Sequence, residues 1–444
     1  MQYISTNDRG PEVTLRQAVL QSTPAQGGLY MPRELPVLPA PFFMNMAEMD
    51  FPEIAYVVAN QLFGGDVSAA ALKNIVDGAF NFPVPVTRLD DGLYVLEQFH
   101  GPTLAFKDFG ARFAARMLSH LHSQGSPAAR RKLHVLIATN GNTGSAMANA
   151  LAGMANIEAH ILFPRGHAGR QLEAQFTTLG GNIHAYEVQG TIDDCHSLVH
   201  QAFADNVLNS IVSLTSANSV NIARLLPQTF CYFYAVARLQ RRLGDKVRVN
   251  LAIPAGNLGN LTAAVAARHM GLPINRIMAC ENANQYLTTL LHDGRDTVPR
   301  AFPTLACGAD KGRPTNIDRL LYLCGNSLDA LRHEIEAHSV DDAHIIRAVN
   351  GCYERYGYTI DPHTSLAYSV ATDDNRITRF DNDRQATLIV ATGHPAKSLT
   401  AMNAITGRPI DLPLQLTRFM AGSDLRRKIQ PSYIALRDSI LQFD

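Results

Sequence analysis

VRVNLAIPAGNLGNLTAAVAARHMGLPINRIMACE, residues 247–281, is the stretch that best predicts the fold class of this chain. Its apolar start, Val247 to Ile253, is typical of a buried β-strand, and the small residues from Thr262 to Met270 are typical of a helix. Gly271 suits the end of that helix, and Ile277 to Cys280 has the pattern of the next strand. The stretch therefore predicts a β-α-β unit with two parallel strands.

The same alternation recurs elsewhere in the chain. A strand is predicted at Lys132–Ala138, followed by a glycine-rich turn and a helix that starts near Ser145. Further strands are predicted at His160–Phe163, Ile183–Val188 and Ala386–Ala391. Helices are predicted at Arg170–Thr178 and from near Asp193, where Thr191 is the expected cap. This order predicts an α/β fold, with parallel sheets covered by helices on both faces. Ligands of such folds bind at the carboxyl ends of the strands, where the glycine-rich turns lie.

The length of the chain indicates more than one domain. At 444 residues it is longer than a single hydrophobic core usually supports, so two or three domains are expected. The N-terminal part shows only mixed helical patches, such as Met46–Leu62. We therefore expect residues 1–95 to form a separate N-terminal domain.

Composition limits the class of partner. The 39 basic and 39 acidic residues cancel, so no overall field attracts nucleic acid or an anionic membrane. A small molecule is the expected partner. No apolar run reaches the roughly 18 residues of a membrane-spanning helix, and the first residues, MQYISTND, lack the basic and apolar blocks of a signal peptide. These observations predict a cytoplasmic protein.

The sequence offers no metal site and no disulfide framework. Its 6 cysteines are far apart and form no C-x-x-C pair. His120 and His122 stand two apart on a predicted helix, so their side chains diverge. His363 and His394 have no evident partner carboxylate and are interpreted as structural histidines. No metal is predicted.

The turn Gly256-Asn257-Leu258-Gly259-Asn260 lies between a predicted strand and a predicted helix. Small residues let successive backbone N–H groups converge, and the helix adds the positive end of its dipole. The turn therefore suits a phosphate, although an ordinary β-to-α turn explains its glycines equally well. A nicotinamide-binding unit with Glu281 as the ribose-binding acid is another interpretation, but the G-x-G-x-x-G fingerprint is absent.

Two further turns carry candidate binding residues. Residues 139–144 (TNGNTG) end a predicted strand and open a helix, and their hydroxyl, carboxamide and N–H groups suit a carboxylate. An N-capped helix start is the more common reason for Thr and Asn at such positions. In residues 216–224 (SANSVNIAR), Asn218 and Arg224 either hold a phosphate together or serve as a cap and a surface arginine.

A lysine stands in the apolar segment 101–110 (GPTLAFKDFG). Desolvation lowers the pKa of a lysine and makes its amine a nucleophile that can form a Schiff base. Most lysines instead extend their ammonium group to water. Lys107 is therefore a candidate catalytic residue that the segment alone does not establish.

Together these segments resemble the threonine synthase family, which belongs to the pyridoxal-phosphate enzymes of fold type II. The resemblance covers nearly the whole chain and rests on the segments GGLYMP (27–32), FHGPTLAFKDFG (99–110), TNGNTG (139–144), LGGN (179–182), SANSVNIAR (216–224), PAGNLGN (254–260), PTN (314–316) and TGHPAK (392–397). The family's turn commonly reads T-S-G-D-T-G, whereas Asn140 and Asn142 stand here in place of Ser and Asp. Sister enzymes of the fold have Asn at the second of these positions. The match also loosens from Cys307 to Lys311.

The resemblance implies a role for each candidate residue. Lys107 is similar to the lysine that forms the Schiff base with pyridoxal 5′-phosphate. The resemblance implies that the cofactor phosphate binds to the loop formed by Gly256, Asn257, Leu258, Gly259 and Asn260. It also implies that Asn142 faces the 3′ oxygen of the cofactor and that Thr392 lies beside its pyridine nitrogen. The implied ligands of the substrate are Thr139, Asn140, Gly141 and Thr143 for its carboxylate, Asn218 and Arg224 for its phosphate, and Arg165 as a further candidate.

The resemblance also implies a fold and a reaction. The fold would be that of the tryptophan synthase β-like enzymes, with a large pyridoxal-phosphate domain at 96–125 and 213–444 and a smaller α/β domain at 126–212. The reaction would convert O-phospho-L-homoserine and water to L-threonine and phosphate, through β,γ-elimination and β-addition of water. The family branch further implies a monomer.

Three other functions remain open at this point. A phospholyase of the same fold would release 2-oxobutanoate instead of threonine. A dehydrogenase would bind NAD at the unit 247–281. A non-catalytic relative would retain the fold as a ligand-binding or regulatory protein, which Asn140 makes conceivable.

Overall fold

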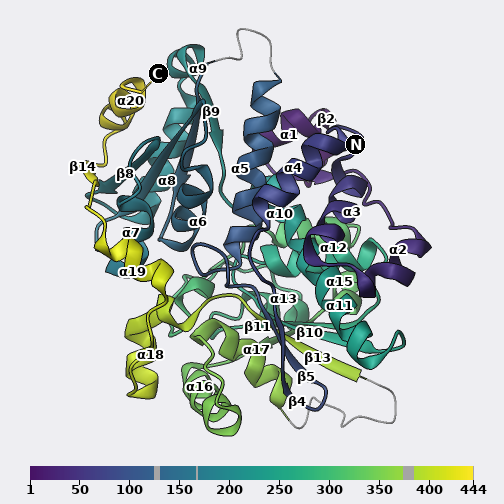
Figure 1. Cartoon of the computed structure of the whole chain (residues 1–444). Coiled ribbons are helices and arrows are strands. Elements are labelled where there is room, and N and C mark those ends of the chain that lie inside the picture. The colour runs from purple at the N-terminus through teal and green to yellow at the C-terminus, as the bar shows by residue number, and fades with distance from the viewer. Residues whose placement is uncertain (125–130, 167–168, 374–384, 444) are drawn as a thin grey trace.

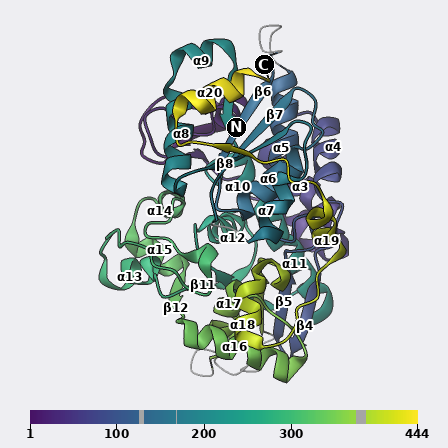
Figure 2. The same cartoon turned by 90° about the vertical axis from the view of Figure 1, so that its left-hand side faces the viewer.

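The computed structural model describes residues 1–124, 131–166, 169–373 and 385–443. In these ranges the strands form sheets of three, six and five strands. The five-stranded and the six-stranded sheet lie at opposite ends of the molecule (Figure 2). No helix within the described ranges has the length and apolar character needed to span a membrane.

The six-stranded sheet has the order β12-β11-β10-β13-β5-β4. Its strands are β4 (Val86–Asp90), β5 (Leu93–Glu97), β10 (Arg248–Pro254), β11 (Ile274–Glu281), β12 (Glu336–Ser339) and β13 (Gln385–Ala391). Neighbouring strands are parallel, except that β4 and β5 are antiparallel. The central strands are buried along most of their length because helices cover both faces, which explains their continuous apolar sequences. The strands predicted at 247–253, 277–280 and 386–391 are confirmed as β10, β11 and β13.

The five-stranded sheet is entirely parallel and has the order β14-β8-β7-β6-β9. Its strands are β6 (Leu133–Ala138), β7 (Ile157–Pro164), β8 (Ile183–Val188), β9 (Ser213–Ser216) and β14 (Arg427–Ile429). The first three confirm the predicted strands. The predicted cap is also confirmed: the side chain of Thr191 accepts a hydrogen bond from the backbone N–H of Asp194 and completes a capping box.

Helices cover both faces of the five-stranded sheet. The helices are α5 (Lys107–Ser123), α6 (Asn142–Leu151) and α7 (Arg170–Thr177) on one face, and α8 (Ile192–Ala204) and α20 (Tyr433–Leu441) on the other. Successive side chains of a strand point to opposite faces, so Val135 and Ile137 enter the core with α5 and α6 whereas Leu136 packs with α8 and α20. Figure 1 shows α5 between this sheet and the N-terminal helices.

The six-stranded sheet is also covered on both faces. Helices α11 (Thr229–Leu243) and α12 (Gly259–His269) pack on one face, and α16 (Asp342–Tyr356) and α17 (Pro362–Thr372) pack on the other. The predicted helix at 262–270 is confirmed as α12, with an earlier start at Gly259. Helix α9 (Asn206–Ile211) lies beside α8 and β9 of the five-stranded sheet, and α19 (Leu414–Ala421) packs on α7. The described ranges also contain α10 (Ile222–Leu225), α13 (Tyr286–Asp293), α14 (Ile317–Leu323), α15 (Leu328–Glu334) and α18 (Leu399–Thr406).

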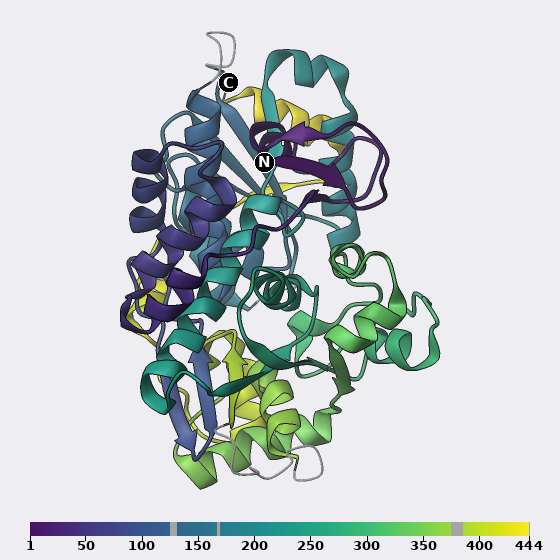
Figure 3. The same cartoon turned by 90° about the vertical axis from the view of Figure 1, so that its right-hand side faces the viewer.

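The N-terminal region contains the three-stranded sheet and four helices (purple in Figure 3). Its elements are β1 (Gln2–Ser5), β2 (Val13–Thr14), α1 (Leu15–Gln21), β3 (Tyr30–Pro32), α2 (Ala40–Asn45), α3 (Phe51–Phe63) and α4 (Ala69–Ala79). Strand pairing crosses the expected domain boundaries. Strands β4 and β5 start before residue 95 but belong to the six-stranded sheet, and β9 and β14 follow residue 212 but belong to the five-stranded sheet.

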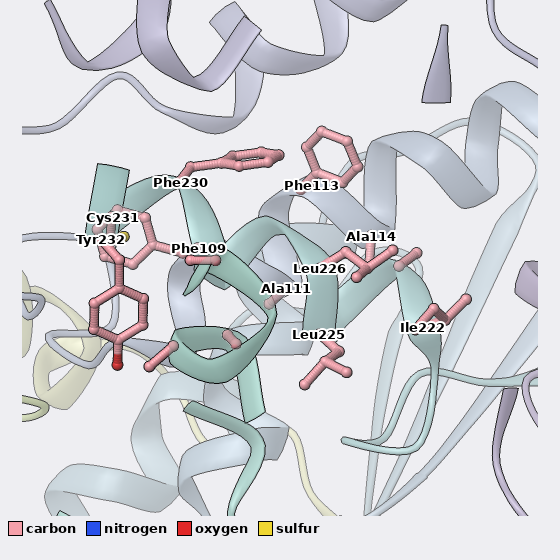
Figure 4. Close-up of a cluster of buried hydrophobic side chains, with 14 of the residues drawn as sticks. Phe109, Ala111, Phe113, Ala114, Ile222, Leu225, Leu226, Phe230, Cys231 and Tyr232 are labelled. Carbon is pink, nitrogen blue, oxygen red and sulfur yellow. The ribbon is translucent and has the colours of Figure 1, made fainter. Parts of the chain in front are cut away.

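A buried aromatic core fixes the position of α5, the helix that begins at Lys107. Phe113 packs edge-on against Phe230 of α11, with ring centroids 5.8 Å apart (Figure 4). Gly110 allows α5 to touch α10, since a Cβ at this position would collide with the carbonyl oxygen of Arg224. The close approach of the two helices holds Arg224 near the first turn of α5.

Candidate active site

Lys107 is held next to the carboxyl end of β13 by backbone hydrogen bonds. The N–H of Phe106 donates to the carbonyl of Thr392 at 2.9 Å, and the N–H of His394 donates to the carbonyl of Leu104 at 3.1 Å. Lys107 itself is the first residue of α5 and is partly buried. The structure thus brings together Lys107 and Thr392, two residues that are far apart in the sequence.

The surroundings of Lys107 favour its neutral amine. Burial, and after it the positive charges of Arg224, Lys311 and Lys397, lower the pKa of Lys107 to about 7. Cys307 acts in the opposite direction. An amine of this kind is a nucleophile and a base near neutral pH.

The cations around Lys107 lack carboxylate partners. Arg224 is buried, and its Nη1 donates to the carbonyl of Ala217 at 2.9 Å while its Nε has no partner. Burial lowers the pKa of Arg224 to about 10. In the described ranges none of Lys107, Arg224, Lys311 and Lys397 forms an ion pair. Uncompensated cations in a poorly solvated site are costly, so the site suits ligands with several negative charges.

Asp108, a carboxylate that acts on this group, is already bonded within its own segment. Asp108 is buried and accepts hydrogen bonds from the backbone N–H of Thr103 at 2.9 Å and from its hydroxyl at 2.6 Å. Burial raises the pKa of Asp108, although these hydrogen bonds oppose the shift. Asp108 therefore shapes the segment before Lys107 and does not neutralise the cations.

The predicted phosphate turn joins β10 to α12. Leu258 adopts a left-handed backbone conformation with φ of 57°, and α12 then starts at Gly259 without any side-chain cap. The backbone N–H groups of the first turn are therefore open to an anion, which the helix dipole also favours. Gly256 fits tightly: a Cβ there would lie 3.0 Å from the carbonyl oxygen of Gly308 and 3.1 Å from Cα of Ala309.

The two asparagine side chains of this turn are fixed by neighbours. Asn257 donates to the hydroxyl of Ser219 at 2.9 Å and accepts from the N–H of Thr315 at 2.7 Å. Asn260 donates to Gln98 at 3.0 Å and accepts from the hydroxyl of Tyr232 at 2.7 Å. Both side chains are occupied in holding the turn, so the backbone is what this turn offers a ligand.

The turn at 139–144 leads from β6 into α6. Thr139 accepts hydrogen bonds on its hydroxyl oxygen from the N–H groups of Gly141 and Gly144, both at 2.9 Å. Its side chain thus stabilises the turn, whereas Asn140 is exposed. The amide oxygen of Asn142 is buried and has no hydrogen-bond partner. A buried polar atom of this kind needs a ligand group to satisfy it.

The remaining predicted residues divide into two groups. Asn218 lies in the loop that leads to Arg224, and its buried amide oxygen also lacks a partner. Arg165, in contrast, is exposed and donates to Gln189 at 3.3 Å. Together with residues of α7 and of the segment 420–428 it lines a separate cavity of about 630 Å³. Asn218 and Arg224 therefore lie in one loop, and Arg165 belongs to a different hollow.

Sequence reasoning missed several residues near Lys107. Lys397 ends the segment TGHPAK (392–397), whose sequence gives it no role, and Lys311 lies where the resemblance loosens. His363 accepts a hydrogen bond from the N–H of Gly308 at 3.1 Å, and burial lowers its pKa while Asp361 opposes this. The sequence shows no evident partner carboxylate for His363, and in the described structure Asp361 acts on it through its charge. No local pattern could have found these residues, because only the fold brings them together.

Comparisons with known proteins agree with this geometry. The sequence profile described as "Pyridoxal-phosphate dependent enzyme" matches residues 81–393, and the profile described as "Threonine synthase N terminus" matches residues 2–80. The threonine synthase of Escherichia coli strain K12 is 36% identical over 437 residues, which cover 98% of each chain. The chain belongs to the threonine synthase family.

Solved structures of threonine synthases have the same fold. The Escherichia coli enzyme superimposes with a TM-score of 0.89 at 34% identity, with all of both chains covered. The pyridoxal-phosphate-bound enzyme of Brucella melitensis gives a TM-score of 0.90 at 29% identity, with 100% of this chain and 99% of that chain covered. The predicted fold type II architecture is confirmed, and the chain is a pyridoxal-phosphate-dependent lyase.

The residues present fit this cofactor. A phosphate suits the uncapped start of α12 behind the tightly packed Gly256, and a reactive amine is available at Lys107. The partnerless amide oxygen of Asn142 offers a polar contact to a ring substituent. Among the described residues, no cluster of three or more His, Cys, Asp or Glu is arranged to hold a metal ion.

Proposed function

We propose that the chain converts O-phospho-L-homoserine and water to L-threonine and inorganic phosphate, with Lys107 as the central catalytic residue. The observation that carries this proposal is the group of three cations around Lys107, namely Arg224, Lys311 and Lys397, which form no ion pair in the described ranges. The substrate carries a phosphate and a carboxylate, and the cofactor carries a further phosphate. Their negative charges would compensate the cations of the site.

Each turn would bind a different group. The backbone N–H groups of Gly256 to Asn260 would hold the cofactor phosphate, since the side chains of Asn257 and Asn260 are already bonded. Asn142 would face the cofactor's 3′ oxygen, and Thr392 would lie beside the ring nitrogen. This assignment places the cofactor between the carboxyl ends of β10 and β13 in the six-stranded sheet and the carboxyl end of β6 in the five-stranded sheet.

The substrate's two anionic groups would bind on either side of the lysine. The turn Thr139–Thr143 would hold the carboxylate through its backbone N–H groups and the hydroxyl of Thr143, with Asn140 at its exposed rim. Arg224 and Asn218 would hold the phosphate by donating hydrogen bonds to it, Arg224 from its Nε, which lacks a partner in the described structure, and Asn218 from its amide nitrogen. Arg165 remains a weaker candidate because it lines a separate cavity.

Lys107 would move the protons of the reaction. When bound, the cofactor supplies an electron sink that makes the hydrogens at Cα and Cβ of the substrate acidic. With its pKa lowered to about 7, Lys107 is neutral often enough near pH 7 to take a proton from Cα and to return one later. A second proton is lost from Cβ, and Arg224 would stabilise the phosphate as it leaves Cγ with the electron pair of the C–O bond. Cγ then gains a proton, water adds its oxygen at Cβ and releases a proton, and Lys107 returns a proton to Cα.

We further propose that the chain acts as a monomer in the cytoplasm. All 6 cysteines are free thiols, and 5 of them are buried. Disulfides are rare in reducing compartments, so free thiols agree with a cytoplasmic location. Sedimentation at several protein concentrations would test the monomer.

The product assay tests the proposed reaction. The purified enzyme with O-phospho-L-homoserine should release threonine and phosphate in equal amounts. Release of phosphate with 2-oxobutanoate in place of threonine would make the chain a phospholyase. Full cofactor occupancy with no phosphate release would contradict the proposed function and favour a non-catalytic relative.

A further inference from the structure

Lys397 connects the segment before Lys107 to the helices that cover the five-stranded sheet. It lies in the 3-10 turn Pro395–Ser398 that follows β13. Its ammonium group donates to the carbonyl of Thr103 and to Oε1 of Gln175, the latter at 3.1 Å. Thr103 lies four residues before Lys107, and Gln175 is a buried residue of α7. One side chain therefore joins elements that belong to the two large sheets.

Both ends of this bridge continue into the active site. On one side, Thr103 anchors Asp108, the residue after Lys107. On the other side, α7 is bound to α6 by the hydroxyl of Ser145, which donates to the carbonyl of Leu172 at 3.2 Å. Helix α6 starts at Asn142, inside the turn proposed to hold the substrate. Hydrogen bonds and short stretches of backbone thus link the segment of Lys107 to that turn.

The bridge is not an ordinary ion pair. In the described ranges Lys397 has no carboxylate within ion-pair distance, and Asp108, the nearest acid to act on it, is bonded to Thr103. Burial lowers the pKa of Lys397 to about 8. A poorly solvated cation with neutral acceptors adds little to stability. Its use must therefore lie in geometry or in its effect on nearby charges.

We propose that Lys397 is a positioning residue: its bond to Gln175 fixes α7 and α6 relative to the Lys107 segment, and so sets the gap between the lysine and the substrate turn. This inference rests on the proposed function, because the gap matters only if the substrate binds between these elements. A misplacement of about 1 Å between reacting groups costs roughly 100-fold in rate. The loss of one such bond is therefore expected to affect turnover more than binding.

Three variants of the holoenzyme test the bridge. Lys397→Met removes the ammonium group at similar length, and Gln175→Leu removes its acceptor on α7. Lys246→Met is the matched control, since Lys246 is exposed and precedes β10. Both bridge variants should lower kcat by roughly 10- to 100-fold with little change in KM. The double variant should lose little more than either single one, because both cut the same link.

Two further readouts separate positioning from a general loss of structure. Amide hydrogen exchange in α7 should become faster in both bridge variants and stay unchanged in Lys246→Met. The pH at which the visible cofactor band is half changed should rise in Lys397→Met. The positive charge of Lys397 disfavours protonation of the nitrogen at Lys107, and this variant removes that charge. Lys397→Arg keeps the charge and should restore the midpoint.

Each outcome decides the proposal. If the bridge variants match the control in kcat and in α7 exchange, the proposal is overturned. If Lys397→Met does not fold, Gln175→Leu gives the same test without removing a charge. Failure of the wild type to form threonine would overturn the proposed function instead, and the exchange of α7 would still report whether the bridge orders this helix.

Discussion

The two strand-to-helix turns of the active site differ in how completely they are held. In the turn 256–260 the side chains of Asn257 and Asn260 each have two partners, and Gly256 packs against the backbone. In the turn 139–144 the amide oxygen of Asn142 has no partner and Asn140 is exposed. Both turns begin an uncapped helix, α12 and α6. The side chains of the first turn already have their partners without a ligand, whereas the second turn still has a polar group to satisfy.

The difference corresponds to what each turn would bind. A cofactor phosphate stays in place through every turnover, so a preorganised cradle of backbone N–H groups suits it. The turn 139–144 would serve two ligands: Asn142 would gain its partner from the cofactor ring, and the exposed Asn140 would lie beside the substrate, which enters and leaves. We therefore assign the first turn to the cofactor phosphate alone and the second to both ligands, and the following variants test that assignment.

Removal of the lysine between the turns should have the largest effect. Lys107→Ala lacks the amine that serves as base, and kcat should fall by at least about 10³-fold. The cofactor phosphate should still bind, because the turn 256–260 is complete without the lysine. Gel filtration followed by phosphate analysis measures this retention. Immediate loss of all cofactor would show that the turn is not an independent cradle.

A methyl group in the first turn should weaken the cofactor. The Cβ of Gly256→Ala would press on backbone atoms at 3.0 and 3.1 Å, and these cannot move without shifting the loop at 308–309. Such overpacking costs about 1–3 kcal/mol, or roughly 10- to 100-fold in cofactor affinity. Gly351→Ala is the control, because a Cβ there meets nothing within 4 Å. Equal affinities in a cofactor titration of both variants would contradict the tight fit.

The unsatisfied amide of the second turn should matter for turnover. Asn142→Ala should lower kcat about tenfold, since one hydrogen bond to a polarised group contributes about 1.5 kcal/mol. The visible band should shift, while the cofactor dissociation constant changes by far less than in Gly256→Ala. Asn142→Asp, the residue common in the family, should restore most activity. An unchanged band in Asn142→Ala would argue that this side chain does not face the cofactor.

The exposed rim of the second turn should show the smallest effect. Asn140→Ser restores the family's hydroxyl at an exposed position, so KM for O-phosphohomoserine should change by less than about fivefold. Cofactor affinity should not change. Steady-state kinetics and a cofactor titration on the same preparation measure both. A change in cofactor affinity would place Asn140 nearer the cofactor than the structure does.

Local patterns predicted the parts of the fold that local chemistry controls. The strand at 183–188 was predicted with the observed bounds, and the cap at Thr191 was confirmed. Helix α12 starts three residues earlier than predicted. It has no capping side chain, so the sequence carried no signal for its first residue. The pairing of β14 with β8 was not predicted, since a strand of 3 residues at an edge carries no periodic signal.

The site was predictable only where its residues follow one another. Both turns and Lys107 were identified from sequence, each with an ordinary structural alternative that local spacing could not exclude. The convergence of Lys311, Lys397 and Arg224 on Lys107 depends on packing between distant segments, such as the contact of Gly110 with Arg224. Arg165 shows the reverse case: the resemblance implied that it binds the substrate, but its side chain lines a separate cavity.

The site of cofactor attachment tests the central claim most directly. The purified protein should show a visible cofactor band that disappears on reduction with borohydride, and mass spectrometry should locate the reduced cofactor on Lys107 alone. This result would establish the lysine between the two turns as the attachment point. A protein that stays colourless after incubation with pyridoxal 5′-phosphate, or a label on another lysine such as Lys397, would contradict the account.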